Sequence, residues 1–107
     1  MSSGIITGNI ASFGVASVTL SPAQVAANTT AEQTFTVPGL RTSDVIVEVS
    51  KPTQQAGLAI GGSRVSAANT MAVTFINATA GAITPTASET YQVVWCRPDA
   101  TLAGVSP

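Results

Sequence analysis

Two neighbouring segments of strict alternation constrain the fold more than any other feature of this sequence. They lie within Asn69–Cys96, and in each of them a larger side chain occupies every second position. The first triplet is Met71, Val73 and Phe75, and the second is Tyr91, Val93 and Trp95. Since successive side chains of a strand point to opposite faces, each triplet lines one face of a β-sheet. The sequence therefore predicts that these two strands form the centre of the core.

Five further segments have strand patterns, and turn residues separate nearly all of them. Gly61-Gly62-Ser63 lies between two short apolar segments and predicts a tight hairpin, because glycine supplies the positive φ that such turns need. The predicted strands are residues 13–21, 33–37, 44–51, 58–60, 64–66, 71–76 and 91–96. These seven strands, with no stretch of helical period, predict an all-β fold: an antiparallel β-sandwich with jelly-roll-like connections and extended N- and C-terminal arms.

The phase of the alternation changes within residues 13–21. Phe13 and Val15 are out of phase with Val18 and Leu20. Because the side-chain period of a strand is two, this change predicts a bulge or bend near Ala16. Residues 23–32 have no strand pattern and are expected to form a loop.

Residues 44–51 place three valines in phase, and the same strand carries two carboxylates. Val45, Val47 and Val49 are expected to face one way. Asp44 and Glu48 would share the other face, about 13 Å apart at ~3.3 Å per residue. The carboxylates of a glycosidase lie roughly 5–9.5 Å apart, so solvated or interface charges are the better interpretation.

Tyr91 follows a segment rich in turn residues, Thr84-Pro85-Thr86. Its hydroxyl is expected either to reach back to the loop backbone, as in a tyrosine corner, or to emerge at the sheet edge. The residues alone leave these two alternatives open.

Charged residues make up 8% of the chain, against about 25% in a typical soluble domain, and the net charge is −1. A charge-depleted surface is typical of the core of a protein interface, so we expect much of this surface to be covered by other subunits. The alternative is a neutral surface that its hydroxyl groups keep soluble. Four basic residues spread along the chain do not form a patch for nucleic acid.

The residue types that carry chemistry are scarce. The chain has no histidine and one cysteine, Cys96, which we expect to be a buried and inert thiol beside Trp95. We therefore predict a non-enzymatic protein without catalytic, metal-binding or cofactor-binding residues. The start of the chain lacks a signal-peptide pattern, and no apolar run approaches the roughly 18 residues of a membrane span, so a membrane partner is not expected.

Three regions are expected: an N-terminal arm (1–12), a β-sandwich domain (13–97) and a C-terminal tail (98–107). Apolar residues in the two ends are candidates for contacts with other subunits: Ile5, Ile6, Ile10, Leu102 and Val105. The alternative is that these residues cap the core of the chain itself.

The run from Val37 to Tyr91, about half the chain, resembles small structural proteins of tailed bacteriophages. The resemblance lies in the VPGL turn with the Asp44 that follows it, the KPT-x-QAGL turn, the R-V-S-A segment, F-x-N, and I-T-P-T-x-x-E-T-Y. These pieces are turn chemistry and strand alternation, so they specify a scaffold rather than an activity. No ligand-binding residue carries over.

This resemblance implies a capsid decoration (cement) protein, a kind of virion structural protein that is often a small jelly roll or β-sandwich. Such proteins bind the outside of the capsid as dimers or trimers and bridge neighbouring capsomers. The implied partners are the major capsid protein and further copies of this chain, and the implied location is the capsid exterior after synthesis in the host cytoplasm. The alternative is a tail-fibre, baseplate or receptor- and glycan-binding β module, which would favour an exposed aromatic platform.

Overall fold

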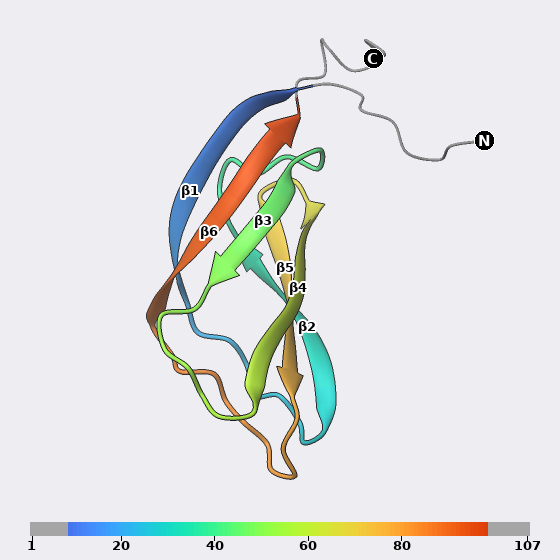
Figure 1. Cartoon of the computed structure of the whole chain (residues 1–107), viewed down its shortest axis with the longest axis vertical. Coiled ribbons are helices and arrows are strands. Elements are labelled where there is room, and N and C mark those ends of the chain that lie inside the picture. The colour runs from blue at the N-terminus through green and yellow to red at the C-terminus, as the bar shows by residue number, and fades with distance from the viewer. Residues whose placement is uncertain (1–8, 99–107) are drawn as a thin grey trace, which may run out of the picture.

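The computed structural model describes residues 9–98, which form six strands in two antiparallel three-stranded sheets (Figure 1). No helix occurs within this range, so the all-β prediction is confirmed. One sheet has the strand order β1–β6–β3 and the other β2–β5–β4. The strands are β1 (Ile10–Leu20), β2 (Thr29–Thr36), β3 (Val45–Ser50), β4 (Leu58–Ala67), β5 (Thr70–Asn77) and β6 (Glu89–Pro98).

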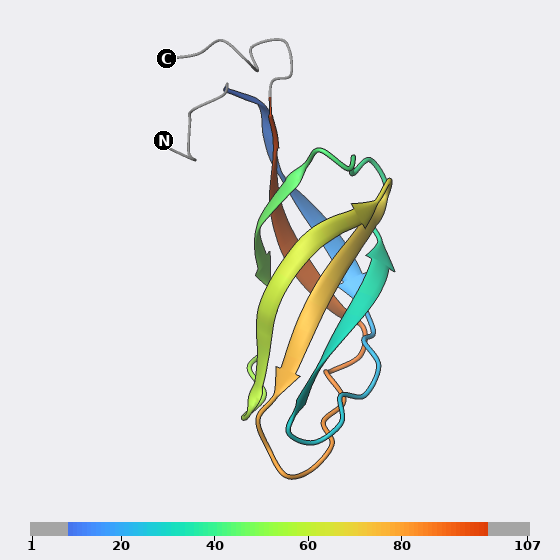
Figure 2. The ribbon, with the colours of Figure 1, turned by 90° about the vertical axis from the view of Figure 1, so that its right-hand side faces the viewer.

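Each of the two predicted central strands is the middle strand of its own sheet. Strand β5 lies between β2 and β4, and strand β6 lies between β1 and β3. The side view shows the two sheets as separate layers (Figure 2). Five of the six triplet residues are fully buried, and Trp95 is partly buried against the same core, which confirms the prediction for both strands. The shared core comprises Leu20, Val25, Val37, Leu40, Met71, Val73, Phe75, Tyr91 and Val93.

The structure has six strands rather than seven because Gly61-Gly62 does not form a turn. Strand β4 runs through both glycines, and neither has a positive φ. Its register with β5 shifts between Ile60 and Gly62, as in a β-bulge. A Cβ on Gly61 would lie 2.6 Å from Cδ1 of Ile76, so the glycine allows close approach instead of a turn. The tight connection lies at Ala68–Asn69, with φ 60° at Asn69.

The phase change in β1 is not absorbed by a bulge near Ala16. Strand β1 pairs with β6 without a register shift from Ser12 to Leu20. Val18 and Leu20 therefore face the core, and Phe13 and Val15 point to the outside of the same sheet. The predicted bulge is therefore wrong, and the regular register leaves the apolar side chains of Phe13 and Val15 exposed.

Strand β3 does contain a bulge, which the alternation did not reveal. The register between β3 and β6 shifts between Ile46 and Glu48, leaving Val47 as the extra residue. Val49 packs against the core, whereas Val45 and Val47 are exposed. The prediction that the three valines share a face is therefore wrong.

The predicted loop at residues 23–32 is shorter than expected, because β2 begins at Thr29 and pairs with β5 along its whole length. The remaining loop is held beside β2 by two hydrogen bonds. The backbone N–H of Ala23 donates to Oε1 of Gln33 (2.7 Å), and Nε2 of Gln33 donates to the carbonyl of Ala23 (2.9 Å).

A buried amide connects the long β5–β6 loop to the loop between β1 and β2. Nδ2 of Asn77 donates to the carbonyls of Val25 (3.1 Å) and Gly81 (2.8 Å). Its Oδ1 accepts from the backbone N–H and the hydroxyl of Thr79 (2.9 and 2.7 Å). Because Asn77 is only 1% exposed, these bonds replace water for both ends of the amide.

Replacing Asn77 with alanine should lower the free energy of unfolding by about 2–3 kcal/mol, since three backbone groups and a hydroxyl lose a buried partner. Urea denaturation measures this loss. The exposed Thr30→Ala change on β2 is the control and should stay within about 0.5 kcal/mol of the parent. An Asn77→Ala protein as stable as the control would show that the amide does not hold the loop.

Candidate functional site

The β1–β6–β3 sheet exposes a contiguous set of apolar side chains on the face that points away from the core. Phe13 and Val45 lie on either side of Cys96 in the pairing register, and Val15 lies beside Val94. Directly paired residues project to the same side of a sheet, so these side chains form neighbouring rows. We call this set the outer apolar face: Ile10, Phe13, Val15, Val45, Val47, Val94 and Cys96.

Five of these side chains are at least half exposed. Their exposed fractions are 58% for Ile10, 63% for Phe13, 61% for Val15, 50% for Val45 and 55% for Val47. Isolated exposed apolar residues are ordinary on protein surfaces, but a contiguous group indicates an interaction site.

Charge is nearly absent from this face. Among the outward positions of β1, β6 and β3 in the described range, the one Asp, Glu, Lys or Arg residue is Glu48, which lies beside Val94. Towards the other end of the sheet the outward side chains become polar. Oγ of Ser17 donates to Oε1 of Gln92 (2.9 Å), and the hydroxyls of Thr19 and Thr90 are 3.2 Å apart. The face therefore has an apolar half and a polar half.

The outside of the β2–β5–β4 sheet has a different chemistry. Arg64 on β4 donates from Nε and Nη2 to the two carboxylate oxygens of Glu32 on β2, both at 2.9 Å. These bonds hold the pKa of Glu32 below its usual value. The pair spans β5, where Ala72, paired with Arg64, is fully buried. The outside of this sheet therefore carries an ion pair over its central strand, where the other sheet carries exposed apolar side chains.

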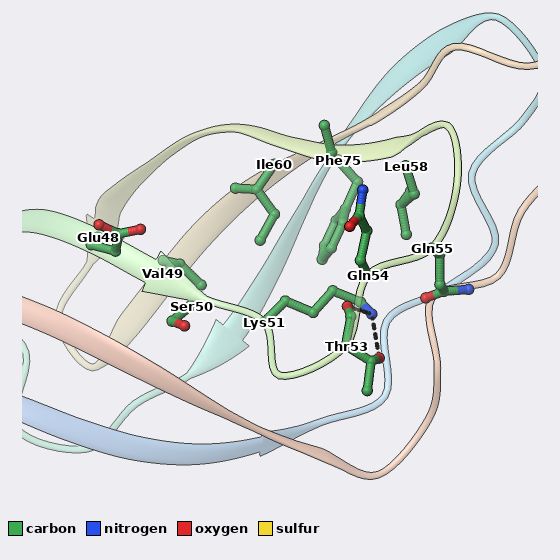
Figure 3. Close-up of a pocket in the computed structure, with 11 residues that line it drawn as sticks. Glu48, Val49, Ser50, Lys51, Thr53, Gln54, Gln55, Leu58, Ile60 and Phe75 are labelled. Carbon is green, nitrogen blue, oxygen red and sulfur yellow. Dashed lines mark hydrogen bonds between the residues drawn. The ribbon is translucent and has the colours of Figure 1, made fainter.

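A cleft of about 310 Å³ opens between strands β3 and β4 (Figure 3). Its floor includes the fully buried Phe75, and its rim carries polar side chains from the β3–β4 connection. The lining residues are Glu48, Val49, Ser50, Lys51, Thr53, Gln54, Gln55, Leu58, Ala59, Ile60 and Phe75.

The main polar groups of this cleft are engaged within the chain. Nζ of Lys51 donates to the carbonyl of Thr53 (2.7 Å) and lies 3.0 Å from Oε1 of Glu89. The Thr53 hydroxyl donates to the same carboxylate, and this bond, followed by Lys51, lowers the pKa of Glu89. Gln55 donates to the carbonyl of Thr84 (3.1 Å) and accepts from the N–H of Thr86 (2.9 Å). These contacts fasten loops, so the cleft is a weaker candidate than the outer apolar face.

The two carboxylates considered from the sequence have different environments. Asp44 precedes β3 and is 7% exposed, whereas Glu48 is exposed. Arg97 donates from Nε to Oδ1 of Asp44 (2.7 Å) and from Nη2 to Oδ2 (2.9 Å). The same oxygen, Oδ2, accepts from the N–H of Arg41 (2.9 Å). The expectation that Asp44 is a solvated or interface charge on the face of Glu48 is therefore wrong.

Tyr91 follows neither of its two expected alternatives. The side chain is fully buried, and within the described residues its hydroxyl has no hydrogen-bond partner. Burial, followed by the charge of Glu89, raises the pKa of Tyr91 to about 12. The tyrosine acts as a core side chain.

Of the predicted contact residues, Ile10 lies at the exposed start of β1, whereas Ile5, Ile6, Leu102 and Val105 lie outside the described residues. Sequence reasoning missed Phe13, Val15, Val45 and Val47. Cys96 is half-buried rather than buried, and it lies in the middle of the outer apolar face instead of in the core. The phase change in residues 13–21 was the signal that could have identified Phe13 and Val15 as exposed, but it also fits a bulge, which is what the sequence predicted.

No group of three or more potential metal ligands is present within residues 9–98. The described part of the chain likewise has no helix that is long and apolar enough to cross a membrane. Comparison of the chain with protein-family models, curated proteins and solved structures gives no match.

The Asp44–Arg97 contact predicts a pH dependence of stability. The hydrogen bonds from Arg97 lower the pKa of Asp44 from its ordinary value of 3.8. A carboxylate with a lowered folded-state pKa stabilises the fold above the unfolded-state pKa, and this contribution is lost as the pH falls through the folded-state value. Asp44→Asn should lower the urea midpoint at pH 7, and its difference from the parent should shrink below about pH 4.

Urea midpoints measured from pH 7 to pH 2 test this expectation. Glu48→Gln is the matched control, since its exposed carboxylate should leave the midpoint nearly unchanged at both ends of the range. A constant difference between Asp44→Asn and the parent across the range would contradict the assignment.

Proposed function

We propose that this chain is a non-enzymatic phage virion structural protein that binds the outside of the capsid and stabilises it, as decoration proteins do. The observation that carries the proposal is the outer apolar face, which presents exposed apolar side chains and one charged residue. Burial of such a face against the capsid would contribute roughly 25 cal/mol per Å² of apolar surface removed from water. The implied partner is the major capsid protein.

The strand order supports the finer part of this proposal, a small β-sandwich with jelly-roll-like connections. The first and last strands pair with each other, and β3 completes their sheet, while β2, β5 and β4 form the facing sheet. Jelly rolls are likewise double sheets, and in this chain every connection between the six strands except β4–β5 crosses from one sheet to the other. A rigid double layer of this kind can present one face to a shell while the polar sheet, with its Arg64–Glu32 pair, faces water.

A decoration protein acts by mass action, because it stabilises the state of the shell that it binds. Neutral apolar contacts suit this task, since their strength depends little on salt. The exposed Phe13 also fits the alternative, a receptor- or glycan-binding β module, because aromatic rings stack on sugars and pack in protein interfaces. The nearly charge-free aliphatic neighbours of Phe13 favour a protein surface as the partner.

Co-sedimentation with mature phage heads that lack the chain tests the proposal. We expect saturable binding at a fixed copy number per head and better survival of the heads on heating. Phe13→Glu should weaken binding about 30-fold, corresponding to about 2 kcal/mol, because a buried apolar contact is replaced by a charge. The matched control, Thr36→Glu, places the same charge at an exposed position on the opposite sheet and should bind like the parent.

Absence of saturable binding by the parent would overturn the proposal, and a screen against immobilised glycans would then test the alternative. Equal loss for Phe13→Glu and Thr36→Glu would show that binding does not use the outer apolar face.

A further inference from the structure

The two sheets leave four edge strands, and three of them carry features that obstruct pairing with another strand. Strand β3 is short, bulged at Val47, and flanked by Asp44 and Lys51. Strand β4 has two register shifts and carries Arg64. Charges, bulges and short length are the usual means by which proteins protect sheet edges.

The third protected edge is β2. It carries Glu32, and its Gln33 side chain holds the preceding loop through both hydrogen bonds to Ala23. Its outward positions are also hydroxyl-rich, with threonines at both ends. This edge therefore presents a polar and partly covered surface.

Strand β1 lacks these features along most of its length, although its register with β6 shifts between Ile10 and Ser12. It is the longest strand, with 11 residues, and it contains neither a charged residue nor a proline. Its register is regular from Ser12 to Leu20, and among the described residues it pairs on one side only, with β6. Each residue of an edge strand offers backbone donors or acceptors that another strand can pair with.

We propose that β1 is a homodimerisation edge, at which two copies of this chain pair antiparallel about a two-fold axis lying within Phe13–Thr19. A two-fold axis makes the contact self-complementary, so one edge suffices and the assembly closes at two subunits. The pairing would join the two β1–β6–β3 sheets into one six-stranded sheet. Phe13 and Val15 of both copies would then lie near the centre of one enlarged apolar face.

The absence of charge on β1 favours a second copy as the occupant. A strand that meets its own copy brings like residues together, so a charged edge would repel itself, whereas this edge is neutral. We expect the dimer to form in the absence of phage heads. Only the role of the dimer in binding to heads rests on the proposed function.

Sedimentation equilibrium and native mass spectrometry of the full chain, without shells, test the proposal. We expect a dimer for the parent. Val15→Lys should raise the dimer dissociation constant at least tenfold, because the lysines of the two copies approach each other across the axis. Val47→Lys is the matched control, since it makes the same change at a similar exposed fraction on the far edge of the same face, and it should remain dimeric. Circular dichroism checks that both variants fold.

Cysteine crosslinking locates the contact. The variants carry Cys96→Ser and one new cysteine, at residue 13, 15, 17 or 19. Each variant is oxidised alone, and variants with cysteines at neighbouring positions are also mixed in pairs and oxidised. Opposed residues of an antiparallel pair have Cα atoms about 4.5–5.5 Å apart, within disulfide range. We expect one position, or one mixture of neighbours, to crosslink in high yield, and Val47→Cys to remain uncrosslinked.

Three results would overturn the dimer. The first is a parent chain that stays monomeric at every accessible concentration. This result includes the case in which the chain dimerises only after residues 1–8 are removed, because residues 1–8 would then occupy the β1 edge. The second is equal weakening by Val15→Lys and Val47→Lys, which indicates face-to-face packing. The third is a dimer in which no β1 position crosslinks. Each of these results leaves binding of the chain to heads a separate question.

Discussion

The two sheets are held together by the contact between two strands that do not pair with each other. Strands β5 and β6 are the central strands of different sheets, and their inward side chains, among them Phe75 and Tyr91, fill one core. Full burial of such large side chains stabilises the fold by roughly 1.5–3 kcal/mol each. The outer strands, the Asn77 loop contact and the Asp44–Arg97 pair are arranged around this core.

Local alternation was sufficient to predict the strands in which the larger side chains occupy every second position without interruption. Strands β5 and β6 each keep their larger side chains on one parity, so their inward faces could be predicted without knowledge of their partners. Elsewhere the local pattern was ambiguous. A phase change permits either a bulge or an exposed apolar pair, and only the register with β6 shows that β1 has the second arrangement. Likewise, a glycine pair permits either a turn or a close approach within a strand, and only the contact with Ile76 on β5 shows that Gly61 has the second role.

Long-range partners explain the errors at the candidate site. Asp44 is buried because Arg97, 53 residues away, reaches it, and nothing near Asp44 in the sequence indicates that pairing. The same limitation hid the outer apolar face, whose members come from three strands that are adjacent only after folding. Low charge predicted an interface, but it could not indicate where on the surface that interface would lie. Exposing Phe13 and Val15 forgoes burial within the chain, which is consistent with a surface that becomes covered on assembly.

The single cysteine provides the most direct measurement of whether the outer apolar face is covered in the proposed complex with a phage head. Cys96 is half-buried between Phe13 and Val45, at the centre of that face and on the middle strand of its sheet. The rate of its alkylation by iodoacetamide can be compared between the free protein and the protein bound to phage heads. We expect a rate at least tenfold lower in the bound state. An unchanged rate on protein shown to be bound would contradict it.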